Sequence, residues 1–222
     1  MDFSPIWISL RTASLSIVVT FFIGLLAGKM VYEIKREKLK FIMDGIFTLP
    51  MVLPPTVAGF FLLYAFGSKR PIGEFLFTQF AVKITFTWWA TVLAAVTISF
   101  PLMYRSARGA FEQVDINLVY AGRTLGLSEG RIFRKIILPN ALPGILSGAV
   151  LSFARGLGEF GATAMIAGNI AGKTRTLPMA VYSAVSAGNM ELAYRYVIIL
   201  VLVSFVIITV MNYITFYNRR WK

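Results

Sequence analysis

Apolar residues dominate five long stretches of this chain, and polar or charged residues gather between them. The stretches cover about residues 6–31, 41–66, 85–104, 142–167 and 194–216. Each is long enough to cross a hydrocarbon core about 30 Å thick as an α-helix that rises 1.5 Å per residue. A membrane β-barrel would instead show alternating segments of about ten residues. The pattern therefore predicts an all-α integral membrane protein with five transmembrane helices.

Basic residues are divided unevenly among the connections, and this predicts the orientation. Cytoplasmic loops of membrane proteins carry the excess of Lys and Arg. An N-terminus outside and a C-terminus in the cytoplasm place most of the basic residues inside. The inner set is Lys29, Lys35, Arg36, Lys38, Lys40, Arg105, Arg108, Arg123, Arg131, Arg134, Lys135, Arg219, Arg220 and Lys222, and the outer set is Lys69, Arg70, Lys83, Lys173 and Arg175.

Composition agrees with this assignment and excludes several functions. Hydrophobic residues make up 57% of the 222 residues and charged residues 14%, whereas soluble domains carry about 25% charged residues. The net charge of +12 follows from the loop bias, so no nucleic-acid partner is predicted. The sequence has no cysteine and no histidine, and its ten acidic residues are scattered. We therefore predict no catalytic residue, no metal site and no cofactor bound by the chain itself.

The segment AGNIAGKT (residues 167–174) is one letter away from a nucleotide-binding P-loop. The P-loop pattern needs a glycine where Ala167 stands, and it follows a strand. The predicted topology also places this segment outside, away from cytosolic ATP. We interpret it as an outer basic loop that attracts an anion or a protein partner, or as an ordinary solvated turn.

The connection between the third and fourth stretches, about residues 105–141, is too long for a simple turn and is amphipathic. Apolar residues with basic neighbours are typical of a helix that lies on a membrane surface or enters a groove of another protein. Asp115 can begin a short helix, Gly126 can end it with a left-handed cap, and Ser128 can cap the next helix. Pro139 and Pro143 are expected to break the chain path before the fourth stretch.

This connection resembles a motif of ABC importer permeases, E-A-A-x3-G-x9-I-x-L-P. Here YAGRTLG is followed after nine residues by IILP, with Tyr120 in place of the glutamate and Gly122 in place of the second alanine. The resemblance implies a cytoplasmic coupling helix that sits in a cleft of an ATP-binding subunit. The residues it assigns to coupling are Tyr120, Ala121, Gly122, Arg123, Leu125, Gly126 and Pro139.

Three further stretches, residues 49–63, 99–115 and 152–178, are similar to molybdate importer permeases, with sulfate permeases as close relatives. The resemblance implies one permease domain over residues 1–222, with a methionine-permease-like fold, and a function as the transmembrane subunit of an ATP-driven oxyanion importer. It implies a homodimer, two ATP-binding subunits that use ATP and Mg, and an extracytoplasmic oxyanion-binding protein. Sulfate, thiosulfate or tungstate transport stays open, as do a stand-alone channel, a secondary transporter and a scaffold without flux.

Charged and helix-breaking residues inside the stretches are the candidates for the transport pathway. Arg155 and Glu159 stand four residues apart and can pair, either as a gate or as a self-neutralising pair that positions helices. Prolines 50, 54 and 55 must kink or interrupt the second stretch. The glycines near Arg155 permit close helix packing or break the helix and free its amides for an anion. The pathway candidates are Pro55, Thr56, Arg155, Glu159 and Thr163.

Overall fold

The computed structural model describes residues 2–219, with side chains as far as Tyr213. These residues form helices and connections without any strand. Four helical stretches are long and apolar enough to cross a membrane, and a bent helix pair brings the total to five. The helices are α1 (Ser4–Glu33), α2 (Glu37–Val52), α3 (Pro55–Phe66), α4 (Pro71–Phe80), α5 (Trp88–Glu112), α6 (Ile116–Thr124), α7 (Glu129–Ile132), the π-helical turn η1 (Phe133–Ile137), α8 (Leu138–Leu157), α9 (Gly161–Ile166), α10 (Leu177–Ser186) and α11 (Met190–Arg219).

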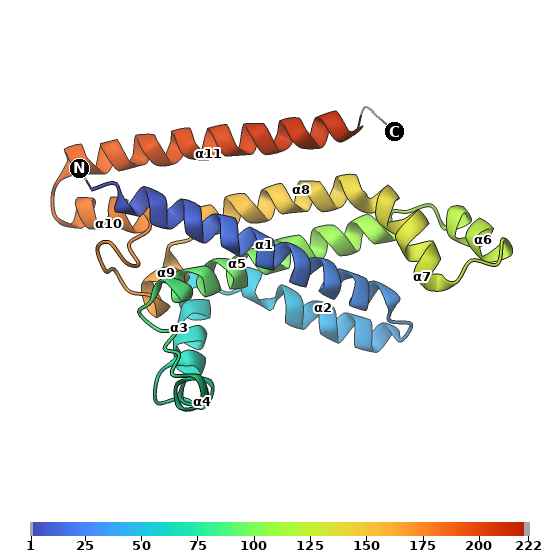
Figure 1. Cartoon of the computed structure of the whole chain (residues 1–222), viewed down its shortest axis with the longest axis horizontal. Helices are drawn as coiled ribbons and strands as arrows, with labels where there is room; N and C mark the ends of the chain where they lie inside the picture. Colours follow the sequence, from blue (N-terminus) through green and yellow to red (C-terminus); the bar gives the residue numbers. More distant parts are fainter. Residues whose placement is uncertain (1, 220–222) are drawn as a thin grey trace.

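The second predicted crossing is the bent pair. Helices α2 and α3 meet at an angle of 109°, and Figure 1 shows α3 running across the long axis of the bundle. Leu53 and Pro54 are both extended, because a proline disfavours helical geometry in the residue before it. The predicted interruption is therefore confirmed at Pro54 and Pro55, while Pro50 lies inside α2.

The predicted break at Pro139 and Pro143 is wrong, because residues 129–157 form one helical span. A π-helical turn precedes Pro139, which stands in the first turn of α8. The wider turn gives the proline ring room, and Asn140 Nδ2 donates to the Ile136 carbonyl at 2.7 Å. Pro143 has no N–H and cannot donate a helical hydrogen bond. It lies between Ala141 and Ile145, and the burial of these two residues in the core keeps α8 helical at this position.

The fourth predicted stretch is not one helix, since α8 ends at Leu157 and α9 begins at Gly161. Gly158, Glu159 and Phe160 form the break between them. Both expected roles for the glycines are present in this structure, because the helix breaks here and a Cβ atom on Gly156 would lie 3.3 Å from Ser16 Oγ of α1.

Small and hydroxyl residues bring the long helices close together. A Cβ atom on Gly24 would lie 2.6 Å from Met103 Cγ, and one on Gly148 would lie 2.3 Å from Ser106 Cβ. Thr12 and Thr91 hydroxyls lie 2.8 Å apart across the α1–α5 interface. This is the packing expected where lipid supplies no hydrophobic drive between helices.

The basic connections gather toward one end of the molecule. Figure 1 shows the α1–α2 turn, the α6–α7 segment and the C-terminal end of α11 toward one end, and the N-terminus, α9 and α10 toward the other. The predicted inner positions Arg220 and Lys222 lie outside the described residues. The arrangement matches the topology that the charge bias requires.

Candidate functional site: the α6 helix and the paired helix breaks

Helix α6 begins and ends where the sequence predicts. Asp115 Oδ1 accepts from the Asn117 N–H at 2.9 Å, which is an N-cap bond. At the other end Gly126 has φ +73°, its N–H donates to the Arg123 carbonyl, and the Leu127 N–H donates to the Gly122 carbonyl. These two bonds define a Schellman cap, so the direction of the chain leaving α6 is fixed.

Ser128 stands at the N-cap position of α7, but its side chain makes no capping hydrogen bond. The expectation of a side-chain cap there is wrong. The chain instead fixes this end of α7 through Arg123, whose Nε lies 2.8 Å from Glu129 Oε1. That contact holds the pKa of Arg123 above its ordinary value and ties α6 to the start of α7.

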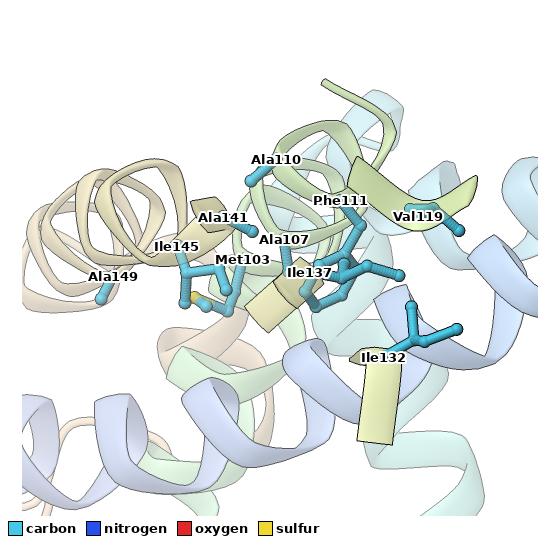
Figure 2. Close-up of a cluster of buried hydrophobic side chains, with 10 residues drawn as sticks. All are labelled: Met103, Ala107, Ala110, Phe111, Val119, Ile132, Ile137, Ala141, Ile145 and Ala149. Atoms are coloured by element: carbon cyan, nitrogen blue, oxygen red, sulfur yellow. The ribbon is translucent and has the colours of Figure 1, made fainter. Parts of the chain in front are cut away.

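One side of α6 is anchored in the core of the bundle. Val119 is buried with Phe111 of α5 and Ile132 of α7 (Figure 2). A Cβ atom on Gly122 would lie 2.7 Å from Ile136 Cδ1, so α6 packs closely against the side chains of η1. The short helix is therefore carried rigidly by α5 and the α7–α8 span.

The other side of α6 is exposed and partly apolar. The exposed fraction is 55% for Tyr120 and 79% for Leu125, and Ala121, Arg123 and Gly126 are exposed as well. Large exposed apolar side chains on a rigid helix outside the membrane spans are typical of a protein–protein contact. Six of the seven residues that the resemblance assigns to coupling thus lie on α6 and its cap, with Gly122 facing inward. Pro139 is separate from them, in the first turn of α8.

The two helix breaks face each other at the opposite part of the bundle. A Cβ atom on Gly161 would lie 3.0 Å from Pro55 Cβ and 3.2 Å from the Thr56 nitrogen. A Cβ atom on Gly59 would lie 2.7 Å from the Ala162 Cα atom. The α2–α3 break and the α8–α9 break, about a hundred residues apart in sequence, therefore form one junction. Broken helices of this kind line cavities in transporters.

Glu159 lies within this junction and is buried, with both of its oxygens engaged. Its Oε2 lies 2.8 Å from Arg155 Nη1, and its Oε1 accepts from the Ala162 N–H at 2.8 Å. The predicted pairing is confirmed. The Ala162 amide at the start of α9 is occupied by the chain's own carboxylate and is not free for a solute anion.

The remaining pathway candidates differ in exposure. The Arg155 side chain is 34% exposed, so the guanidinium is the accessible member of its pair. Thr56 is exposed and Pro55 is half-buried, whereas Thr163 is buried in α9. The junction thus presents a hydroxyl and part of a guanidinium, both of which can donate to an oxyanion.

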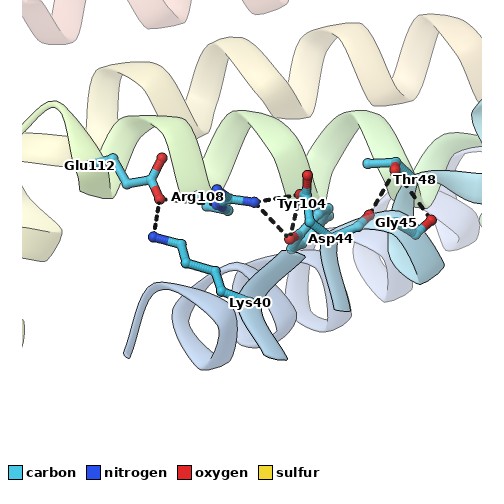
Figure 3. A network of polar contacts seen from close by, with 7 residues as sticks. All are labelled: Lys40, Asp44, Gly45, Thr48, Tyr104, Arg108 and Glu112. Carbon is cyan, nitrogen blue, oxygen red and sulfur yellow. Dashed lines mark hydrogen bonds and ion pairs between the residues drawn. The ribbon is translucent and has the colours of Figure 1, made fainter. Parts of the chain in front are cut away.

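A polar network that the sequence analysis did not predict joins α2 to α5. Asp44 of α2 pairs with Arg108 of α5 and accepts from the Tyr104 hydroxyl at 2.9 Å (Figure 3). Lys40 Nζ lies 2.7 Å from Glu112 Oε1, which also pairs with Arg108. The two i,i+4 pairs, residues 40 and 44 and residues 108 and 112, were the available signal. Helix α2 buries no residue fully, so this network is its main polar attachment to α5.

The outer segment 167–174 is a loop held by its own hydrogen bonds and is not a P-loop. Thr174 is fully buried, and its hydroxyl accepts from the Ile170 N–H at 3.0 Å and donates to the Gly168 carbonyl. A short helix, α9, precedes it, and no strand occurs within residues 2–219. Nor does the described part of the chain hold three or more metal-ligating side chains in one group.

Comparison with known proteins identifies the class. Residues 20–221 match the family described as the binding-protein-dependent transport system inner membrane component. The chain belongs to this family, and it is a multi-pass protein of the inner membrane. It is a component of a transport system.

Two relatives are similar to this chain in sequence, and two solved structures are similar to it in fold. YvgM of Bacillus subtilis (strain 168), named as a molybdenum transport system permease, is 41% identical over 93% of this chain and 90% of its own length. The molybdenum transport permease ModB of Escherichia coli (strain K12) is 41% identical over 86% of this chain and 82% of its own. The inward-facing MetNI methionine ABC transporter gives a TM-score of 0.76 at 21% identity, over 95% of this chain and 93% of that chain. A bacterial ABC transporter that imports the acidic polysaccharide alginate gives a TM-score of 0.78 at 14% identity, over 96% of this chain and 78% of that chain. The predicted methionine-permease-like fold is confirmed.

Proposed function

We propose that this chain is the permease subunit of an ATP-driven importer for a tetrahedral oxyanion, with molybdate as the substrate. The observation that carries the proposal is α6, a capped helix anchored to the core by Val119 and presenting Tyr120 and Leu125 outward. A channel or a secondary carrier has no use for such a helix. The molybdenum transport relatives supply the choice of substrate.

The assembly we propose has two copies of this chain, two separate ATP-binding subunits and an extracytoplasmic binding protein. ATP and Mg are bound by the ATP-binding subunits. Tyr120, Ala121, Arg123, Leu125 and Gly126 form the surface that enters a cleft of the ATP-binding subunit. Gly122 allows α6 to pack closely, and Pro139 shapes the start of α8.

The direction of transport requires an energy source of this kind. Moving a dianion against an inside-negative potential of about 100 mV costs roughly 4.6 kcal/mol before any concentration gradient. A passive pore cannot accumulate such an ion. Closure of the ATP-binding subunits moves α6, and because α6 is fixed to α5 and the α7–α8 span, those helices move with it. The junction at Pro55, Thr56, Arg155 and Glu159 then opens and closes as the gate.

The test is reconstitution of the complete complex in liposomes, with a binding protein on the outside and ATP enclosed. We expect ATP-dependent uptake of molybdate that sulfate does not match at equal concentration. Faster uptake of sulfate, thiosulfate or tungstate would change the substrate but keep the importer. Flux driven by an ion gradient in the absence of ATP-binding subunits would overturn the class, and an absence of any flux would leave a scaffold.

A further inference from the structure

A cavity of about 380 Å³ opens at the outer end of the bundle, between the first turns of α1, the start of α5 and the loop that follows α9. Its lining includes Trp7 and Arg11 of α1, Trp88 of α5, and Gly172 and Lys173 of the AGNIAGKT segment. This cavity is separate from the α6 surface and from the junction of the two helix breaks. Neither the proposed coupling surface nor the proposed gate uses it.

The charge of this cavity is positive. Arg11 and Lys173 are its charged lining residues. Within the described part of the chain neither of them forms an ion pair with a carboxylate. Asp2, an acidic residue of the same end, is engaged by the Ser4 N–H at 2.8 Å and by the Ser4 hydroxyl at 2.7 Å. An anion that enters the cavity therefore meets two cations.

Arg11 is held in a defined orientation. Its guanidinium carbon lies 3.8 Å from the centre of the Trp88 ring. That ring is itself fixed, because Trp88 Nε1 donates to the Thr12 hydroxyl at 3.0 Å. A guanidinium stacked on an aromatic face keeps its N–H edge available for two oxygens of a phosphate-type group.

The depth of Arg11 indicates which anion it meets. Helix α1 has 30 residues and is thus about 45 Å long, close to the 40–45 Å of a bilayer with its headgroups. Arg11 lies about 10 Å from the outer start of the helix, near the boundary between headgroups and hydrocarbon. Trp7, one turn further out, is 68% exposed, as is typical of the aromatic belt at that boundary.

The surface below Arg11 suits acyl chains. Val18, Phe22 and Leu26 are exposed by 52%, 59% and 65% and follow Arg11 along the same side of α1 at spacings of seven, four and four residues. A headgroup bound at Arg11 would lay its chains along this apolar stripe. A free anion in water would gain nothing from the stripe.

We infer that this cavity binds the phosphate group of an anionic phospholipid in the outer leaflet. Arg11 and Lys173 neutralise the phosphate, and Trp7 borders the headgroup. The outer loop is thereby tied to α1 through a lipid. A soluble oxyanion shares the tetrahedral chemistry, so the experiment must separate the two sources.

The test uses the purified importer complex, whose thermal unfolding is followed while phosphatidylglycerol, phosphatidylcholine, inorganic phosphate or molybdate is added. We expect phosphatidylglycerol, but not phosphatidylcholine or inorganic phosphate, to raise the unfolding midpoint, with an affinity that falls about fivefold for each cation removed in Arg11→Gln and Lys173→Gln. Molybdate, the proposed substrate, binds in the transport pathway and should stabilise these variants as it stabilises the wild type. Lys69→Gln removes one positive charge from the loop between α3 and α4 and should leave the affinity unchanged. Arg11→Lys retains the charge and should lose less affinity than Arg11→Gln.

Three outcomes would overturn the inference. Protection by inorganic phosphate or molybdate that is lost in Arg11→Gln and Lys173→Gln would make this a site for a soluble anion. Equal loss in Lys69→Gln would reduce the effect to general surface charge. Unchanged affinity in the folded double variant of Arg11 and Lys173 would exclude the cavity. Because these readouts do not depend on uptake, a failure here is distinguishable from a failure of the proposed transport function.

Discussion

Gly126 is held at φ +73° by the Schellman cap of α6, and no other atom lies near the position of its missing Cβ. A branched residue there is strained by backbone geometry alone, at about 1–2 kcal/mol. In Gly126→Val we expect the cap to open and Leu125 to leave its place on the exposed side. ATP hydrolysis by the complex should continue, while molybdate uptake per ATP falls several-fold. Uptake and hydrolysis in liposomes measure this ratio.

The matched control is Gly130→Val in α7. Gly130 also has open space around its Cβ position but lacks a positive φ, and valine and glycine differ little in helix propensity. This variant should couple normally. Normal coupling by an assembled Gly126→Val complex would contradict the assignment of α6.

Glu159 and Arg155 provide a second prediction for single residues. In Glu159→Gln the charge of Arg155 loses its carboxylate partner. Because the Arg155 side chain is about one-third exposed, we expect the free energy of unfolding to fall by about 1–3 kcal/mol. The double variant Arg155→Gln with Glu159→Gln should unfold close to the wild-type midpoint, as a self-neutralising pair requires. Thermal unfolding gives stability, and uptake by the double variant gives the role in transport. If a stable double variant takes up molybdate at the wild-type rate, Arg155 and Glu159 are not part of the gate.

Among the helices, the contact between α3 and α9 depends on Gly59. A Cβ atom there would lie 2.7 Å from a backbone atom of Ala162, so Gly59→Ala must push α3 away from α9. Overpacking of this kind costs about 1–3 kcal/mol. We expect a lower unfolding midpoint and slower uptake, because the two helix breaks no longer meet. Gly45→Ala in α2 has open space and serves as the control; an equal loss in both variants would show that the junction is not special.

Local chemistry decides which helices are predictable from sequence. Asp115 and Gly126 bound α6 through contacts within a few residues, and Pro54 and Pro55 end α2 through the restriction on the preceding residue. The helix around Pro143 could not be foreseen, since packing of α8 on α5 overrides the local signal. The glycines near Arg155 left the end of α8 open between close packing and a helix break, because the apolar pattern continues across the break without a change.

Contacts between distant elements are the part of the site that no local pattern contains. Asp44 and Arg108 are 64 residues apart, and the α2–α3 break meets the α8–α9 break across about a hundred residues. Each of these residues carries a weak signal by itself, as a single charge in an apolar stretch or a basic connection, or as a glycine in an apolar run. Only the folded arrangement shows which of them are partners. The pairing of Arg155 with Glu159 was predictable because it is local.

At the scale of the whole molecule, orientation in the membrane unites the charge bias with the position of α6. The chain has no cysteine, so a single introduced thiol reports on one position without background. Ser128→Cys, between α6 and α7, and Ala171→Cys, in the loop after α9, both replace exposed residues. Figure 1 shows the α6–α7 segment and α9 toward opposite ends of the molecule. In intact cells a membrane-impermeant maleimide should label Ala171→Cys, and it should label Ser128→Cys only after the membrane is permeabilised. Labelling of Ser128→Cys in intact cells would place α6 outside, where it could not meet an ATP-binding subunit, and the proposed function would fail with it.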